Sequence, residues 1–324
     1  MKRMEIFGTL KKDMDAVERS LYASIENESE ALGEAAMHLL KAGGKRLRPA
    51  FVLLGGKFGT YELERLQSVA VPLELIHMAS LVHDDVIDNA QTRRGQLTVK
   101  AQWDNRIAMY TGDYIYAKAL EMITVLENPQ IHRILAKAMV EMSIGEMEQI
   151  RDFFNAGQSI RRYMLRIRRK TALLIAVSCQ LGALAAGASA SAARELYNYG
   201  YNVGMAFQIR DDLLDLCGTE KQIGKPPGSD IRQGNITIPV LYALQDEALR
   251  GPLLEEISRI HAADGRTDVS RAVGMITGSA GIARAEELAE RYTQKALAAL
   301  DRLPDIRARR HLRDIAHFVS RRMY

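Results

Sequence analysis

The sequence predicts an all-α protein that forms one helical bundle over residues 1–324. Apolar residues recur at three- and four-residue steps in several long stretches, which is typical of amphipathic helices. No stretch of useful length alternates between apolar and polar residues as a strand would, and no proline occurs between Gln130 and Lys225. With 47% hydrophobic and 26% charged residues, the composition excludes a disordered or collagen-like chain and supplies enough apolar material for a large core.

The helical periodicity can be followed in order along the chain. It is clearest in three stretches, which contain Leu66, Val69, Leu73 and Ile76, then Ile134, Ala138, Met142 and Gly145, and finally Leu196, Tyr199, Val203 and Phe207. Turn signals separate the predicted helices at Gly43–Gly44, Glu127–Pro129, Gly157, Gly187 and Lys225–Gly228. These breaks predict about ten or more helices of ordinary length. No shift in composition marks a boundary, so we expect a single domain.

Residues 171–193 carry no charge and follow a basic run, which raises the question of a membrane span. Gly187 to Ser191 has the composition of a small-residue turn, with Ser191 placed to cap the following helix. Only residues 171–186 remain for an apolar helix, whereas a bilayer needs about 20 residues. The length favours a buried core helix.

The charge and cysteine content narrow the class of protein. Cys179 and Cys217 lie in apolar stretches without CxxC spacing, which argues against a disulfide framework or a zinc site. Residues 1–20 have no apolar core typical of a signal peptide, so we expect a cytoplasmic protein. The net charge is only +4, but the basic residues are clustered and lack interleaved aromatic residues. Such clusters suit phosphate groups better than nucleic acid bases.

Two acidic clusters of the form DDxxD carry the strongest chemical signal. The first consists of Asp84, Asp85 and Asp88, and the second of Asp211, Asp212 and Asp215. On a helix, residues four apart share a face, so each cluster presents a pair of like charges. Magnesium would offset that repulsion, because it prefers oxygen ligands and takes one or two carboxylates together with substrate phosphates. One such cluster could equally be a solvated surface or a helix cap, but two copies favour a metal site.

Basic residues accompany both clusters. The turn Gly43–Pro49 reads GGKRLRP and would present Gly44, Lys45 and Arg48 at a helix start, where a diphosphate can bind, although a solvated loop is an equal alternative. Arg93 and Arg94 follow the first cluster closely. A cationic lining could be completed by Lys170, Thr171, Gln208 and Lys225, each of which alone is more typical of a structural residue. His77 lies two turns before Asp84, and a lone histidine is usually a core residue.

These motifs occur in a characteristic order: GGKRLRP, LVHDDVIDNAQTRRG, KTALL, FQIRDDLLD and GKPPGSDIRQGN. In this order they resemble the trans-isoprenyl diphosphate synthase family from about residue 5 to the C-terminus. Within the family, segments such as HMASLVHDDVID and WDNRIAMYTGDY are most similar to the catalytic components of two-subunit, heptaprenyl-forming synthases.

The resemblance implies an all-α bundle of the isoprenoid synthase type with a central cavity, and a prenyltransferase that adds isopentenyl diphosphate to an allylic diphosphate such as farnesyl diphosphate. The aspartates of both motifs would bind the allylic diphosphate with two to three Mg²⁺ ions, the metal ligands being Asp84, Asp88 and Asp211. By the same resemblance, isopentenyl diphosphate binds Lys45, Arg48, His77 and Arg94, and the allylic substrate binds Arg93, Lys170, Thr171, Gln208 and Lys225. Product chains for menaquinone and a small partner subunit are also implied, with a homodimer as the alternative.

Two positions bear on details of this expectation. Asn235 stands where many members of the family carry a second lysine after the second motif. Ala79 and Ser80 lie about one turn before Asp84, where short-chain relatives have bulky aromatic residues, so these small side chains predict a medium or long product. The remaining alternatives are a homodimeric synthase of hexaprenyl to decaprenyl length, a non-catalytic diphosphate-binding subunit, and a terpene cyclase, which the second DDxxD motif disfavours.

Overall fold

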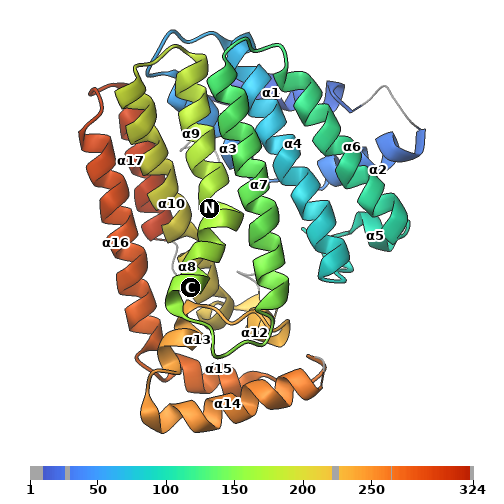
Figure 1. The fold of residues 1–324 in the computed structure, drawn as a ribbon, viewed down its shortest axis with the longest axis vertical. Helices are drawn as coiled ribbons and strands as arrows, with labels where there is room; N and C mark the ends of the chain where they lie inside the picture. Colours follow the sequence, from blue (N-terminus) through green and yellow to red (C-terminus); the bar gives the residue numbers. More distant parts are fainter. Residues whose placement is uncertain (1–9, 26–29, 221–225, 264, 322–324) are drawn as a thin grey trace. The chain divides into compact units, whose positions relative to one another are not determined.

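The structure is a computed structural model that describes residues 10–25, 30–220, 226–263 and 265–321. Helices account for most of these residues, which confirms the predicted all-α class (Figure 1). The first half of the chain forms α1 (Lys11–Ala23), α2 (Glu30–Lys41), α3 (Leu47–Gly56), α4 (Leu63–Ile87), β1 (Thr92–Arg93), β2 (Gln96–Leu97), α5 (Val99–Gln102), α6 (Asn105–Ile123) and α7 (Pro129–Arg151). The second half forms α8 (Ile160–Ile167), the π-helix η2 (Arg168–Ala172), α9 (Leu173–Ala185), α10 (Ala190–Cys217), α12 (Ser229–Arg232), α13 (Ile238–Ala243), α14 (Glu247–Ala262), α15 (Ser270–Thr277), α16 (Gly281–Asp301) and α17 (Arg307–Ser320).

The chain divides into two compact units. Unit 1 contains Met1–Leu135, Val177–Tyr197 and Leu303–Leu312. Unit 2 contains Ala136–Ala176, Asn198–Arg302 and Arg313–Tyr324. The first aspartate motif belongs to unit 1 and the second to unit 2. The single domain expected from composition stays a prediction.

Helix α4 is the core of unit 1. It packs against α1, α3 and α6, and it runs beside α6 along much of its length (Figure 1). The residues of its middle part are buried on nearly every side, so the helix shows almost no amphipathic pattern. Helix α4 continues through Pro72, although proline removes a backbone hydrogen bond from a helix interior. It carries the first aspartate motif in its last turn.

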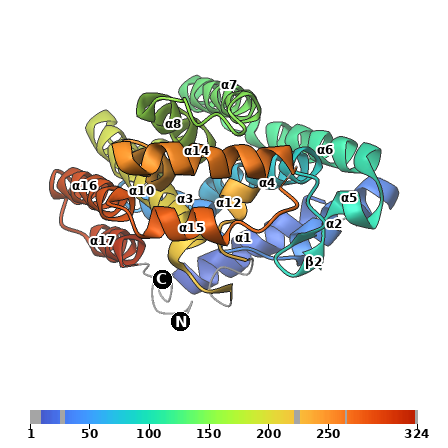
Figure 2. The same cartoon turned by 90° about the horizontal axis from the view of Figure 1, so that it is seen from below.

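The core of unit 2 surrounds the second half of α10. Ile209 and Leu213 of this helix are buried together with Tyr163, Val240 and Ile257 from α8, α13 and α14. Helices α14 and α15 of the same unit lie side by side, as the view from below shows (Figure 2). The apolar contacts hold the last two turns of α10, and therefore the second aspartate motif, in a defined orientation.

Three local features differ from the sequence-based expectations. The helix after the Gly187 turn begins at Ala190, where the Ser189 Oγ accepts a hydrogen bond from the Ala192 N–H at 3.2 Å, so Ser189 and not Ser191 caps it. The basic run before α9 forms the π-helix η2, which periodicity did not indicate. A two-stranded hairpin, β1–β2, interrupts the helices after the first motif.

The uncharged segment is a short core helix, as predicted. Helix α9 spans 13 residues, and Gly187 adopts a left-handed backbone with φ of 68° directly after it. Among the described residues, no helix combines the length and the apolar character that a membrane crossing requires.

Candidate active site

The basic turn of unit 1 connects α2 to α3. Lys45 is exposed, whereas Arg46 is buried and caps α3 in a left-handed conformation with φ of 48°. A Cβ at Gly44 would lie 2.7 Å from the Arg94 Nη1 atom, so the lack of a side chain at this position allows Arg94 to approach the turn. The structure therefore brings two of the predicted binding segments, GGKRLRP and the RRG stretch, into contact.

The RRG stretch forms the tip of the β1–β2 hairpin. Arg94 and Gly95 both have positive φ, at 55° and 79°, which is the backbone of a tight type I′ turn. Arg93 precedes the turn and points back to α4, where its Nε and Nη2 atoms each lie 2.8 Å from the Asp85 Oδ1 atom. The hairpin thus separates the two arginines, because Arg93 binds the aspartate motif and Arg94 packs on the basic turn.

His77 and Arg48 are partly buried beside this basic turn. Burial lowers the pKa of His77 well below its usual value, and the positive charges of Arg48, Arg94, Arg93 and Arg46 lower it further. Burial also lowers the pKa of Arg48 to about 10, although nearby Glu74 opposes the shift. The Arg48 Nε atom is buried and has no hydrogen-bond partner among the described residues. A neutral imidazole amid several guanidinium groups, one with an unsatisfied donor, is the environment of an anion site.

The first aspartate motif lies at the C-terminal end of α4. Asp84 and Asp88 are partly exposed, and Asp88 caps the helix. Asp85 is only 2% exposed, and burial raises its pKa while the ion pair with Arg93 lowers it. A helix C-terminus carries partial negative charge, so further carboxylates there are unfavourable without a cation.

The second motif occupies the last two turns of α10. Asp212 is 2% exposed and accepts hydrogen bonds from the Tyr163 hydroxyl and, at 2.9 Å, from the Gln208 Nε2 atom. Burial, with the nearby charge of Asp230, raises the pKa of Asp212 to about 8, although both hydrogen bonds oppose the shift. Gln208 in turn accepts a hydrogen bond from the Thr171 hydroxyl at 2.7 Å. Two predicted allylic-substrate ligands, Thr171 and Gln208, therefore belong to the network that holds Asp212.

Asp215 supports the backbone after the motif. Its Oδ2 atom accepts a hydrogen bond from the Asp230 N–H at 3.0 Å, and its carbonyl accepts one from the Gly228 N–H at 2.8 Å. Asp211 remains partly exposed. Asp85, Asp212 and Asp215 are thus buried and hydrogen-bonded within the protein, whereas Asp84, Asp88 and Asp211 are partly exposed.

The accessible carboxylates are donors of the type that magnesium takes when it shares its ligands with substrate. No group of three or more histidine, cysteine or acidic side chains within the described parts of the chain is arranged to hold a metal by itself. Magnesium characteristically takes only one or two carboxylates and completes its shell with water and phosphate oxygens. Asp84 and Asp88 of unit 1 and Asp211 of unit 2 are donors of this type, and their assignment as metal ligands stays a prediction.

Lys170 lies in the π-helix η2 and contacts α7. Its Nζ atom is 2.5 Å from the Glu146 Oε2 atom and 2.8 Å from the Gln149 Oε1 atom. Single-turn π-helices often occur at functional sites, because they re-aim the side chains of one turn. The structure places Lys170 one residue before Thr171, and Lys225 lies outside the described residues.

Sequence reasoning missed three residues that organise these sites, namely Arg46, Glu74 and Tyr163. Glu74 offered a usable signal, because it is an isolated charge in the apolar stretch Val71–Ile76. A charge at such a position needs a buried partner, which the structure identifies as Arg46, at 3.2 Å. Tyr163 had no comparable signal, because its partner Asp212 is far away in sequence.

Replacing Tyr163 by phenylalanine tests the Asp212 network. We expect a loss of roughly 1–3 kcal/mol in the free energy of unfolding, because a buried carboxylate oxygen loses its donor. We also expect kcat to fall about tenfold, because Asp212 loses the Tyr163 hydroxyl that helps to orient the motif. Urea unfolding and steady-state kinetics measure both effects. The control Tyr201→Phe changes a half-buried tyrosine of α10 and should alter stability by less than about 0.5 kcal/mol.

The folded chain thus presents aspartate-rich helix ends, suited to metal-bound phosphates, and a cluster of basic residues around the turn before α3, suited to a diphosphate. An all-helical protein with this combination belongs to the class of enzymes that act on prenyl diphosphates. The chain matches the Polyprenyl synthetase family model over residues 29–276. It is 53% identical to heptaprenyl diphosphate synthase component 2 of Geobacillus stearothermophilus over 100% of both chains. The protein of the same name from Bacillus subtilis is 49% identical over 100% of this chain and 92% of its own.

Solved structures of polyprenyl diphosphate synthases are also similar to this chain. The crystal structure of heptaprenyl diphosphate synthase from Staphylococcus aureus has a TM-score of 0.89 at 37% identity, covering 96% of this chain and 98% of that one. Polyprenyl synthase from Caulobacter crescentus, complexed with calcium and isoprenyl diphosphate, has a TM-score of 0.91 at 33% identity, covering 99% and 98%. The chain belongs to the polyprenyl synthetase family and is a chain-elongating trans-prenyltransferase. The resemblance stated from the sequence motifs is confirmed.

Proposed function

We propose that this enzyme makes heptaprenyl diphosphate from farnesyl diphosphate and isopentenyl diphosphate, as the catalytic component of a two-subunit synthase. The observation that carries the proposal is the full-length identity of 53% and 49% to two proteins named as component 2 of this synthase. Supply of a menaquinone side chain is the corresponding physiological role. The cytoplasmic location expected from the sequence stays a prediction.

Residues of unit 1 bind isopentenyl diphosphate in this proposal. Lys45, Arg48 and Arg94 neutralise its diphosphate, and the unsatisfied Nε donor of Arg48 gains an acceptor. Burial and the surrounding arginines lower the pKa of His77, so its imidazole is neutral at neutral pH. A neutral imidazole can still donate one N–H hydrogen bond to the diphosphate. These contacts hold the double bond of isopentenyl diphosphate in position as the nucleophile.

The aspartate motifs hold the allylic diphosphate through metal. The binding of calcium and isoprenyl diphosphate by the Caulobacter relative supports a divalent cation, which we assign as Mg²⁺ at Asp84, Asp88 and Asp211, with two to three ions bound. When bound, Mg²⁺ supplies Lewis-acid neutralisation of the charge that grows on the departing diphosphate. Asp85 and Asp212 keep the motifs oriented through Arg93 and Tyr163.

The reaction needs no nucleophilic side chain. The allylic C–O bond breaks and its electron pair leaves with the diphosphate, then the double bond of isopentenyl diphosphate attacks the allylic cation. A proton is finally lost, which we assign to the released diphosphate as base. The protein's part is to bind both substrates, to orient them and to exclude water from the cation.

Asn235 leaves this site with one less positive charge than a lysine would. Its side chain is partly exposed, and its backbone N–H donates to the Asp230 carbonyl at 2.8 Å. The segment is therefore held by backbone contacts that do not depend on the side chain at position 235. We propose that the binding of the allylic diphosphate relies instead on Arg93, Lys170 and Lys225.

Exposed apolar side chains support a partner subunit. On α6, Met109, Tyr110 and Leu120 are 41%, 64% and 45% exposed. On α7, Val140, Ile144 and Met147 recur at helical spacing and are 60%, 40% and 65% exposed. Large apolar side chains gathered on one helix face commonly mark a protein interface. We propose a heterodimer with a small component 1 subunit, and a homodimer is the alternative.

Product analysis tests the proposed function. Purified protein is incubated with farnesyl diphosphate, labelled isopentenyl diphosphate and Mg²⁺, alone and with a candidate component 1 subunit, and the dephosphorylated products are sized. We expect heptaprenyl chains only when the partner is present. Long chains from this protein alone would identify a self-sufficient homodimeric synthase, and no elongation in either case would favour a diphosphate-binding subunit.

A further inference from the structure

Arg46 makes an unusually complete set of contacts for a residue in a turn. Its Nε and Nη2 atoms lie 2.8 and 2.9 Å from the two carboxylate oxygens of Glu18. Its Nη1 atom lies 3.2 Å from the Glu74 Oε1 atom, and Nη2 also donates to the Leu40 carbonyl at 3.3 Å. All three nitrogens of the guanidinium group are therefore engaged within unit 1.

These acceptors come from three different helices. Glu18 belongs to α1, Leu40 to the last turn of α2, and Glu74 to the middle of α4. Arg46 is 7% exposed and Glu74 only 2%, so this ion pair is shielded from solvent. Because a guanidinium group is planar and its donors have fixed directions, three simultaneous acceptors define the position of Arg46 closely. The basic turn is thus fastened to the body of unit 1 at one residue.

The contacts also explain a strained backbone. Arg46 has φ of 48°, a left-handed conformation that is uncommon for residues other than glycine. Such conformations persist where the surrounding contacts over-determine them, and they often occur beside functional sites. The residues on either side of Arg46 therefore have different surroundings. Lys45 is exposed to solvent, and Arg48 lies in the first turn of α3.

Glu74 links Arg46 to the proposed binding pocket. Its negative charge acts on both arginines: it helps to raise the pKa of Arg46, and it opposes the lowering of the Arg48 pKa by burial. On α4, Glu74 also lies three residues, or about one turn, before His77. One buried carboxylate therefore faces the anchor of the turn and one of the predicted diphosphate ligands.

We propose that Arg46, held by Glu18 and Glu74, is a positioning residue for isopentenyl diphosphate. It does not itself touch the substrate, because its donors point into the protein, but it sets the places of Lys45 and Arg48. The inference rests on the proposed function, in which these two residues bind the diphosphate. Because Glu18 belongs to α1, this helix also helps to position the substrate ligands, although it carries none of them itself.

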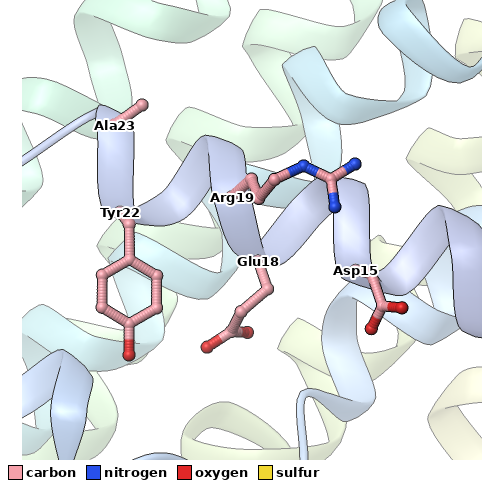
Figure 3. Close-up of a pocket in the computed structure, with 5 residues that line it drawn as sticks. All are labelled: Asp15, Glu18, Arg19, Tyr22 and Ala23. Carbon is pink, nitrogen blue, oxygen red and sulfur yellow. The ribbon is translucent and has the colours of Figure 1, made fainter.

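Glu18 offers the mildest way to disturb the cluster. It is 36% exposed, and it lines a surface depression of about 420 Å³ on α1 together with Asp15, Arg19, Tyr22 and Ala23 (Figure 3). Glu18→Gln removes the charge but keeps the shape, and its Tm shows whether a kinetic change comes with a loss of stability. Arg46→Lys keeps the charge but replaces the fork by a single ammonium group. Arg19→Met is the matched control, because Arg19 is exposed on the same helix and lines the same depression.

The test is steady-state kinetics of the complete enzyme with each substrate varied in turn. For Glu18→Gln and Arg46→Lys we expect the KM for isopentenyl diphosphate to rise about 5- to 20-fold, with kcat and the KM for the allylic primer changed by less than about threefold. Lys45→Ala and Arg48→Ala should raise the same KM at least as much. Arg19→Met should leave all constants unchanged.

Two outcomes would overturn the inference, and both are distinct from a failure of the proposed function. One is an unchanged KM for isopentenyl diphosphate in Glu18→Gln and Arg46→Lys while Lys45→Ala and Arg48→Ala raise it. The other is an equal rise in the KM for both substrates, accompanied by a lower Tm, as a merely structural role of Arg46 would produce. If neither Lys45→Ala nor Arg48→Ala affects this KM, the proposed binding site itself is wrong.

Discussion

Substitution of Asp84 or Asp211 by alanine or asparagine is expected to lower kcat by about a thousandfold or more, because stabilisation of the leaving diphosphate by metal is worth several kcal/mol. Both aspartates are partly exposed at the ends of helices α4 and α10. Neither change removes a buried group, so the variants should keep their fold. Single-turnover formation of labelled prenyl products measures the effect.

The middle carboxylates provide an internal comparison. Asp85→Asn and Asp212→Asn alter side chains that are 2% exposed and hydrogen-bonded to Arg93 and to Tyr163 with Gln208. We expect these variants to lose stability as well as rate, whereas the Asp84 and Asp211 variants lose rate alone. Asp15→Asn, an exposed aspartate on α1, is the control and should behave as the wild type. Near-normal rates for the Asp84 and Asp211 variants would contradict the assignment of these residues as metal ligands.

Ser80→Phe is expected to shorten the product from heptaprenyl to a chain with fewer isoprene units. Ser80 lies one turn before Asp84 on α4 and is partly exposed, with its hydroxyl donating to the His77 carbonyl at 2.8 Å. A growing chain that extends from the diphosphate at Asp84 passes this position in the proposed function. A phenyl ring there occupies the path, so elongation stops early. Sizing of the dephosphorylated products after Ser80→Phe measures the result.

The two small residues predicted to set chain length are not equivalent in the structure. Ala79 is 0% exposed, so a phenylalanine at this position must displace packed neighbours at a cost of about 1–3 kcal/mol. We therefore expect Ala79→Phe to lower Tm, and any truncation that it causes comes with that loss. Val125→Phe is the control, because it adds a ring outside α4 at a position that is 68% exposed, and it should leave the product ladder unchanged. An unchanged ladder in both Ser80→Phe and Ala79→Phe would remove the chain-length role.

The sequence alone determined the fold class and the location of the chemistry. Helical periodicity depends only on local spacing, so the all-α class and most helix breaks could be predicted without tertiary contacts. The same holds for the two aspartate motifs, because residues i and i+4 share a face on any helix. The choice between Ser189 and Ser191 as the cap of α10 could not be predicted, since both residue types suit an N-cap and only the backbone conformation decides.

Only the tertiary structure decided which of these side chains remain accessible. Asp85 and Asp212 look like their neighbours in sequence, but Arg93 and Tyr163 occupy their oxygens. In the sequence, Arg46 likewise does not differ from the other basic residues of GGKRLRP. In the structure it contacts Glu18 and Glu74, each 28 residues away along the chain. The physical reason is that a periodic pattern reports which face of a helix is buried, whereas the partner of a buried charge comes from another helix. That partner is set by packing, so the division between the proposed metal ligands and the buried supporting residues exists only in the folded chain.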